Sequence, residues 1–294
     1  MKKLLITGGS GFVGTFVTEL AAPGYEVYSL YSQHVPGHRK ATLIQVNFTN
    51  PDQLHQVLAR VRPDIILHTA AISKPDACEA DRDRTVQVNI QATVSLADWA
   101  RANGARMIFT SSDLVFDGRR GHYSEDDATN PISFYGETKA RAEQLLSAMD
   151  FNCALVRLAL VYGIGQLHQE NFFHQMVNQL RAGKSVNLFY DQFRTPISGI
   201  TLAEALLELA ESDFTGILHV GGSERISRWD FGLKACAILN LPTDTLQRTS
   251  MFDFPSAASR PQDVSMNTTL AQRVLRTKLL DCTEGLQRVK SALP

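Results

Sequence analysis

Short apolar runs alternate with amphipathic stretches through the first half of the chain. The apolar runs are rich in Leu, Ile and Val, as is typical of strands that are buried on both faces. We expect strands at residues 4–6, 26–31, 42–46, 64–68, 106–110 and 154–157. Helical patterns fill the intervals, one ending near Ala22 and others at residues 51–61 and 85–103. This alternation predicts an α/β fold with a doubly wound parallel sheet, covered by helices on both faces.

The alternation becomes irregular after Gly163. Helical patterns occur at residues 172–182, 202–212 and 228–239, and strand patterns at 186–188 and 217–220, with proline-containing loops between them. No internal repeat, low-complexity segment or linker is evident. We therefore expect a sheet domain made of residues 1–163 and about 197–222. A smaller C-terminal α/β lobe is expected from residues 164–196 and 223–294.

The composition of the 294-residue chain is ordinary for a globular protein. Lys and Arg total 29 and Asp and Glu total 30, so the net charge of -1 offers no basic excess for a nucleic acid. The first apolar run ends at Gly8, too early for a signal sequence or a membrane span. The cysteines form no CxxC pair or Cys/His cluster, which argues against a metal site. We expect a cytoplasmic protein with reduced thiols that binds neither nucleic acid nor membrane.

A glycine-rich turn joins the first expected strand to the first helix. Gly8, Gly11 and Gly14 stand in a GxxGxxG pattern. Glycines there permit a tight turn, a close approach of the backbone to a pyrophosphate, and close packing of helix on strand. The helix N-terminus adds unpaired N–H groups and partial positive charge. The pattern therefore predicts that this turn binds a dinucleotide. The residues expected to contact it are Gly8, Ser10, Gly11, Phe12, Val13 and Gly14.

The end of the second expected strand indicates which dinucleotide binds. Folds of this type that bind NAD place an acid there to hold the ribose 2′-OH. Here the strand ends at Tyr31 and Ser32, with Arg39 and Lys40 nearby, so no carboxylate repels a 2′-phosphate. We expect NADP(H) as the cofactor, with Ser32 in contact with it. NAD(H) remains an alternative.

Tyr135 and Lys139 are four residues apart and share one face of an expected helix. A phenol has an ordinary pKa near 10, and a neighbouring ammonium favours the phenolate and lowers that pKa. Such a pair can transfer a proton at neutral pH. Combined with the glycine turn, the Tyr-x-x-x-Lys pair resembles the extended branch of the short-chain dehydrogenase/reductase superfamily, over essentially the whole chain. The resemblance implies a Rossmann fold for the sheet domain.

The resemblance also implies roles for further residues. It places a catalytic hydroxyl at Ser112, at the end of the fifth strand, to act with Tyr135 and Lys139. In this superfamily the lysine also binds the nicotinamide ribose, and an asparagine matching Asn89 supports the active-site helix. The cofactor contacts that the resemblance implies are Asn47, Phe48, Thr69, Ala70, Ala71, Asn89, Tyr135 and Lys139.

Several segments resemble the dTDP-4-dehydrorhamnose reductase family. They lie at residues 111–118, 161–163, 171–173, 191–196, 218–222 and 260–261. This resemblance implies NADPH-dependent reduction of the 4-keto group of a nucleotide-linked deoxysugar, as in dTDP-rhamnose biosynthesis. Tyr135 would donate the proton and Ser112 would polarise the carbonyl. The implied substrate contacts are Ser112, Asn171, Arg194 and Arg260, the last three toward the diphosphate or nucleoside. Family members are often dimers, so a homodimer is an open alternative.

Departures from the family pattern leave alternatives open. Leu114 stands where the family usually has Tyr, so the sugar is not specified. Related dehydratases carry a glutamate at that position, and NAD-retaining epimerases usually keep an acid after the second strand, which makes both activities weaker alternatives. The Ser-Ser-Asp segment ending at Asp113, together with Pro75 and Asp76, also resembles the regulatory beta subunit of methionine adenosyltransferase. An NADP-binding regulatory protein is therefore the main alternative to a reductase.

Overall fold

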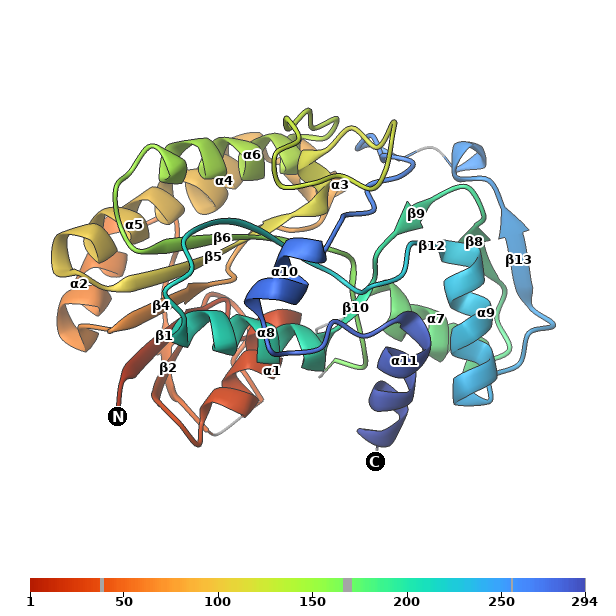
Figure 1. The fold of residues 1–294 in the computed structure, drawn as a ribbon, viewed down its shortest axis with the longest axis horizontal. Coiled ribbons are helices and arrows are strands. Elements are labelled where there is room, and N and C mark those ends of the chain that lie inside the picture. Colours follow the sequence, from red (N-terminus) through yellow and green to blue (C-terminus); the bar gives the residue numbers. More distant parts are fainter. Residues whose placement is uncertain (38–39, 166–170, 255, 294) are drawn as a thin grey trace.

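Seven parallel strands form the central sheet, in the order β11-β6-β5-β4-β1-β2-β3 (Figure 1). The structure is a computed structural model and describes residues 1–37, 40–165, 171–254 and 256–293. The strands are β1 (Lys3–Thr7), β2 (Glu26–Tyr31), β3 (Thr42–Gln45), β4 (Ile65–His68), β5 (Arg106–Ser112), β6 (Cys153–Leu158) and β11 (Gly216–Val220). The strand order reverses between β1 and β4, which opens a crevice at the carboxyl ends of these strands. The predicted doubly wound Rossmann fold is confirmed.

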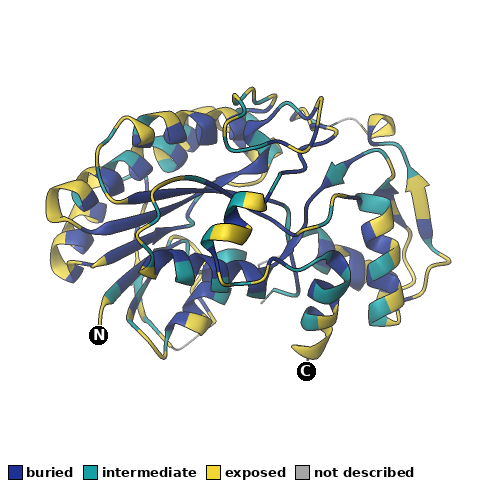
Figure 2. Ribbon diagram, in the orientation of Figure 1, coloured by how far each residue is buried: buried dark blue, intermediate teal, exposed yellow. Residues whose placement is uncertain are grey.

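Helices cover both faces of the sheet. One face packs against α1 (Phe12–Ala21) and α8 (Gly199–Glu211), and the other against α2 (Pro51–Val61), α5 (Ala92–Asn103) and α6 (Phe134–Ser147). Each face of the sheet has its own apolar core, and successive side chains of β1 point to opposite faces. Leu4 and Ile6 lie in one core and Leu5 lies in the other. Figure 2 shows the strands buried between helices whose outward sides are exposed.

The helix predicted at residues 85–103 is divided into three parts. α4 (Arg82–Val86) leads into a π-helical turn at Gln87–Gln91, and α5 follows. π-Helical turns are rare and occur mostly at functional sites. Here the turn carries Asn89, whose amide accepts a hydrogen bond from the N–H of Ile72 and donates one to its carbonyl. The turn therefore fixes the chain just after β4, where the crevice opens.

A smaller lobe covers one end of the sheet domain. Its helices are α7 (Phe172–Arg181), α9 (Arg228–Leu239) and α11 (Cys282–Ser291). Its strands pair in twos, β8 (Val186–Phe189) with β13 (Leu246–Thr249) and β9 (Phe193–Arg194) with β12 (Ile226–Ser227). The lobe has its own apolar core, in which Phe173, Met176, Phe231 and Leu286 are buried.

The chain passes between the two parts more than once. β7 (Val161–Tyr162) pairs with β10 (Ile197–Ser198), which leads the chain back into the sheet domain through α8. Later, α10 (Thr269–Val274) and the residues after it pack on the sheet, and Ala271, Leu275 and Leu279 share a core with Leu4. Part of the span predicted for the lobe, residues 223–294, therefore belongs to the core of the sheet domain. The other predicted boundaries between the sheet domain and the lobe stay a prediction.

All four cysteines are buried free thiols, as the sequence predicted. Across the described ranges, no helix combines the length and the apolar character that crossing a membrane requires.

Candidate active site

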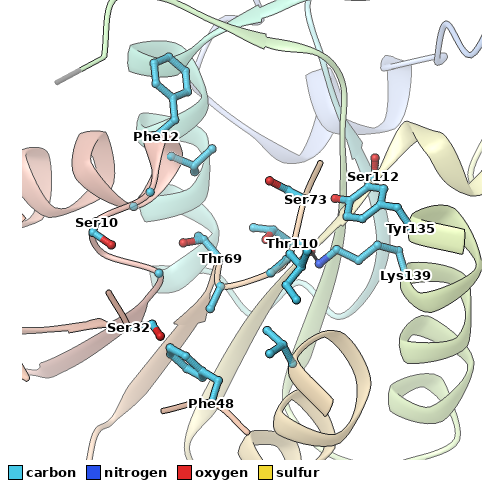
Figure 3. A pocket seen from close by; sticks show the side chains of 18 of the residues that line it. Ser10, Phe12, Ser32, Phe48, Thr69, Ser73, Thr110, Ser112, Tyr135 and Lys139 are labelled. Carbon is cyan, nitrogen blue, oxygen red and sulfur yellow. Dashed lines mark hydrogen bonds between the residues drawn. The ribbon is translucent and has the colours of Figure 1, made fainter. Parts of the chain in front are cut away.

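A cleft of about 460 Å³ opens at the carboxyl ends of the central strands (Figure 3). The structure brings together there nearly all the residues predicted to bind the cofactor or to act in catalysis. Those that line it are Gly8, Ser10, Gly11, Phe12, Val13, Gly14, Ser32, Asn47, Phe48, Thr69, Ala70, Ala71, Ser112, Tyr135 and Lys139. These residues lie at or just after the ends of five strands, β1 to β5, and in the helices α1 and α6, so they converge on one hollow as the parallel topology requires.

The glycine turn forms one end of the cleft and fits a dinucleotide phosphate. Gly8 has a φ of +69°, and a Cβ there would lie 2.8 Å from the backbone N of Ala70. A Cβ on Gly14 would lie 2.2 Å from the carbonyl oxygen of Gly8. The first turn of α1 has neither a side-chain cap nor an acidic residue. Its N–H groups are therefore open to an anion, whereas Asn and Ser side chains cap α2, α6 and α7.

Asn89 is the one predicted cofactor residue that does not line the cleft. Its side chain is fully buried behind the cleft wall, where it bonds to Ile72 and donates to Thr138 Oγ1 at 3.1 Å. Asn89 therefore ties the segment after β4 to α6, the helix that carries Tyr135 and Lys139. This is the supporting position that the resemblance implied, and a direct contact of Asn89 with the cofactor stays a prediction.

Sequence reasoning missed several polar side chains that line the cleft. They are Gln33, His34, Thr49, Ser73, Arg84, Thr110 and Ser111. All except Arg84 lie within two residues of a predicted residue, so the same strand ends could have supplied them. Arg84 lies in α4, and in the sequence it looks like any solvent-exposed arginine of a helix, so it could not have been predicted. Of the two basic residues expected near Ser32, Arg39 lies outside the described residues, and Lys40 lines a different hollow.

Ser112 and Tyr135 lie next to each other at the inner end of the cleft (Figure 3). Ser112 ends β5 and caps the short turn that follows, because its Oγ accepts a hydrogen bond from Leu114 N at 3.2 Å. Tyr135 lies in the first turn of α6, which Ser133 caps. A Cβ on Gly136 would lie 2.2 Å from the carbonyl oxygen of Leu114. Glycine at this position therefore lets α6 approach the Ser112 turn.

Tyr135 holds its proton at neutral pH. Burial raises the pKa of its phenol well above the ordinary value, and the Ser112 hydroxyl offsets part of that rise. The lowering of this pKa that we expect from Lys139 together with an oxidised nicotinamide stays a prediction, because burial dominates in the protein alone. Lys139 Nζ donates to the carbonyl oxygen of Thr110 at 2.7 Å and lies over the Phe109 ring. Its burial lowers its own pKa to about 8.

A buried ion pair stands behind Ser112. Ser112 Oγ donates to Asp113 Oδ1 at 3.2 Å, and Asp113 Oδ2 lies 3.7 Å from Arg194 Nε. Burial raises the pKa of Asp113 to about 6, although Arg194 and the Ser112 bond oppose the rise. The other N–H groups of Arg194 donate to backbone carbonyls, including that of Pro261 at 3.2 Å. Arg194 thus holds the β9 strand and the 261–262 segment against the Ser112 turn.

None of the three residues predicted to contact the diphosphate or nucleoside lines this cleft. The guanidinium of Arg194 already pairs with Asp113 and donates to backbone carbonyls. Asn171 caps α7, because its side chain accepts from the N–H groups of Phe173 and His174 and donates to Gly163. Arg260 is half exposed and lies 3.6 Å from Asp76 Oδ2.

Comparison with known proteins assigns the family. The profile of the RmlD substrate binding domain matches residues 1–293. The chain belongs to the RmlD substrate binding domain family. Bovine (Bos taurus) methionine adenosyltransferase 2 subunit beta is 28% identical to this family member over 277 residues, which span 90% of this chain and 80% of the relative. The resemblance to both groups that the sequence motifs indicated is confirmed.

Two further relatives of this RmlD family member are reductases by name. The probable low-salt glycan biosynthesis reductase Agl14 of Haloferax volcanii is 30% identical over 261 residues, with 87% of each chain covered. A crystal structure of dTDP-4-dehydrorhamnose reductase from Bacillus anthracis in complex with NADP is 25% identical and covers 99% of each chain. Its TM-score of 0.88 shows that the two chains share their fold over nearly their whole length.

Proposed function

We propose that the protein is an NADPH-dependent reductase of a nucleotide-linked 4-keto-deoxysugar, similar to dTDP-4-dehydrorhamnose reductase. One observation carries this proposal. Ser112, Tyr135 and Lys139 meet at the inner end of a cleft whose outer end is the glycine turn. Family membership and the NADP-bound Bacillus anthracis neighbour support it.

The residues of the cleft fit a nicotinamide dinucleotide. The glycine turn and the N-terminus of α1 would hold the diphosphate, and Asn47 and Phe48 the adenine. Ser32 stands where a carboxylate would select NAD, which favours NADP(H), with NAD(H) as the alternative. When bound, the nicotinamide supplies the hydride for the carbonyl carbon of the substrate.

The protein's own residues then handle the proton. Tyr135, which is protonated at neutral pH, would donate its proton to the oxygen that gains charge as the carbonyl is reduced. Ser112 would hold that oxygen beside the phenol. Lys139 places a positive charge below the site, which would stabilise the phenolate that remains. Burial of all three side chains keeps bulk water from this exchange.

A second function is favoured by the similarity to methionine adenosyltransferase 2 subunit beta. A regulatory protein of that kind would bind NADP and a partner enzyme, and an intact Ser, Tyr and Lys set would not by itself produce turnover. The two functions differ in whether a sugar nucleotide is reduced.

The deciding experiment follows NADPH oxidation at 340 nm with a panel of nucleotide-linked 4-keto-6-deoxysugars. We expect turnover with at least one of them, and a loss of about 100-fold or more in Tyr135→Phe. Tyr190→Phe, which alters an exposed tyrosine of the lobe, is the matched control and should retain activity. NADPH binding without turnover on the whole panel would instead favour the regulatory protein.

A further inference from the structure

Arg228 is a partly buried arginine of the lobe whose charge has no acidic partner among the described residues. It is the first residue of α9, and its guanidinium carbon lies 3.5 Å from the centre of the Phe172 ring. In the part of the chain that the structure describes, its guanidinium makes no hydrogen bond and no ion pair. Stacking on a ring uses one face of the guanidinium and leaves its N–H edges free to donate.

The surroundings of Arg228 are positively charged. Burial is the main reason why the pKa of Arg228 is lowered to about 9, and the nearby charges of Arg194 and Arg260 contribute to the lowering. Asp113 is the acid that opposes them, but this carboxylate already faces Arg194 and Ser112. Two arginines and one carboxylate thus lie near Arg228. An anion bound at this place would relieve the mutual repulsion of the arginines and pair with the free guanidinium.

The neighbouring arginines differ in how free they are to bind a ligand. Arg194 is buried and donates to backbone carbonyls, so it is already occupied. Arg260 is half exposed, and its contact with Asp76 is an ion pair of 3.6 Å with no hydrogen bond. Within the described ranges, the Arg228 side chain has neither kind of partner. The group available for an anion is therefore Arg228, with Arg260 as a second cation that can turn from Asp76.

We propose that Arg228 is the main anchor for the diphosphate of the nucleotide-linked substrate, a role that sequence reasoning had given to Asn171, Arg194 and Arg260. The inference rests on the proposed function, because it takes the substrate class from there. A guanidinium matches phosphate oxygens through paired N–H groups, and the Phe172 ring holds its plane. Asp113 links this site to the reaction, since it lies close to Arg228 and bonds to Ser112.

The test measures binding of dTDP and UDP by calorimetry to protein saturated with NADP⁺, so that the cofactor cleft is filled. Arg228→Met keeps an apolar chain on Phe172 and removes the charge. We expect it to weaken binding of the preferred nucleoside diphosphate at least tenfold, while NADPH affinity and the melting temperature stay close to wild type. Arg228→Lys keeps the charge but not the paired donors, so it should fall between wild type and Arg228→Met.

Arg248→Met is the matched control. Arg248 also stacks on a ring, 4.1 Å from the centre of Tyr190, but it is exposed on β13 and does not belong to the arginine cluster. Its substitution should leave the affinity within twofold. Equal nucleotide affinity in Arg228→Met and wild type would overturn the assignment of Arg228 and leave the reductase proposal standing. A wild-type protein that binds NADP⁺ but no nucleoside diphosphate, with GDP and CDP also tried, would overturn both.

Discussion

Arg194 in the lobe and Asp113 in the sheet domain form a buried ion pair with 3.7 Å between Nε and Oδ2. This distance is too long for a hydrogen bond, so the pairing only partly offsets the burial of the carboxylate. The pKa of Asp113 is consequently raised to about 6, and its other oxygen accepts from Ser112. The charge of an acid beside the reacting groups thus depends on an arginine from the other part of the molecule.

Asp113→Asn should change how stability depends on pH. The folded protein binds the Asp113 proton more tightly than the unfolded chain does, so wild type should lose stability as pH rises from about 4 to about 6. Relative to Asp113→Asn, that loss is about 3 kcal/mol at most. Urea unfolding of both proteins at several pH values measures it. In Arg194→Met the pH range of this loss should extend to higher pH, because Arg194 lowers the pKa of Asp113. A difference in unfolding free energy between wild type and Asp113→Asn that does not change with pH would contradict the argument.

Lys139→Met should show the opposite sign in a different window. Burial lowers the pKa of Lys139 to about 8, so above this pH the unfolded chain binds more protons than the folded one. Wild type should therefore gain stability relative to Lys139→Met between pH 8 and about 10.5, by about 3 kcal/mol at most. Unfolding curves of the cofactor-free proteins across this range provide the measurement. A relative loss of wild-type stability there would show that Lys139 is not desolvated.

Gly14→Ala should damage the cofactor site. The new Cβ would lie 2.2 Å from the carbonyl oxygen of Gly8, and neither backbone can move without opening the turn. We expect a loss of stability of about 1–3 kcal/mol and NADPH binding weakened more than tenfold. Gly24→Ala is the control, because the nearest atom to its Cβ lies 3.9 Å away. Thermal melts and NADPH fluorescence titrations of both variants decide the point, and similar results for the two would refute it.

Ser32→Asp should reverse the preference for the phosphorylated cofactor. A carboxylate at this position of the cleft would repel a 2′-phosphate and accept from a ribose 2′-OH. We expect kcat/KM for NADPH to fall about tenfold or more, and the value for NADH to hold or rise. Ser32→Asn, which has the same size without the charge, should change the ratio far less. A ratio unaffected by the charge would place the 2′-phosphate elsewhere.

The features of the fold and the site that depend on local sequence patterns could be predicted. The range of α2 and that of α9 match the predictions to the residue, and the glycine turn and the Ser, Tyr and Lys residues meet in one cleft. These features follow from periodicity, from the conformational needs of glycine, and from the fact that parallel strands end at one edge of a sheet.

The lobe side of the site was less predictable, because it depends on contacts between residues far apart in the chain. Arg194 is a plausible phosphate ligand until the carbonyls near Pro261 and the carboxylate of Asp113 are seen to occupy it. Arg228 appears in the sequence as an ordinary first residue of a helix. Asn171 is different, since an asparagine directly before a helical pattern is a typical cap and could have been predicted as one.

The shared core of Leu4 and Leu279 also bears on how the protein is made. Residues of the first strand belong to the same apolar core as Ala271, Leu275 and Leu279, which follow it by more than 200 residues in the sequence. A growing chain on the ribosome cannot complete this core until residue 279 has emerged from the exit tunnel. The core on this side of β1 is therefore completed only after all seven strands of the sheet have been synthesised.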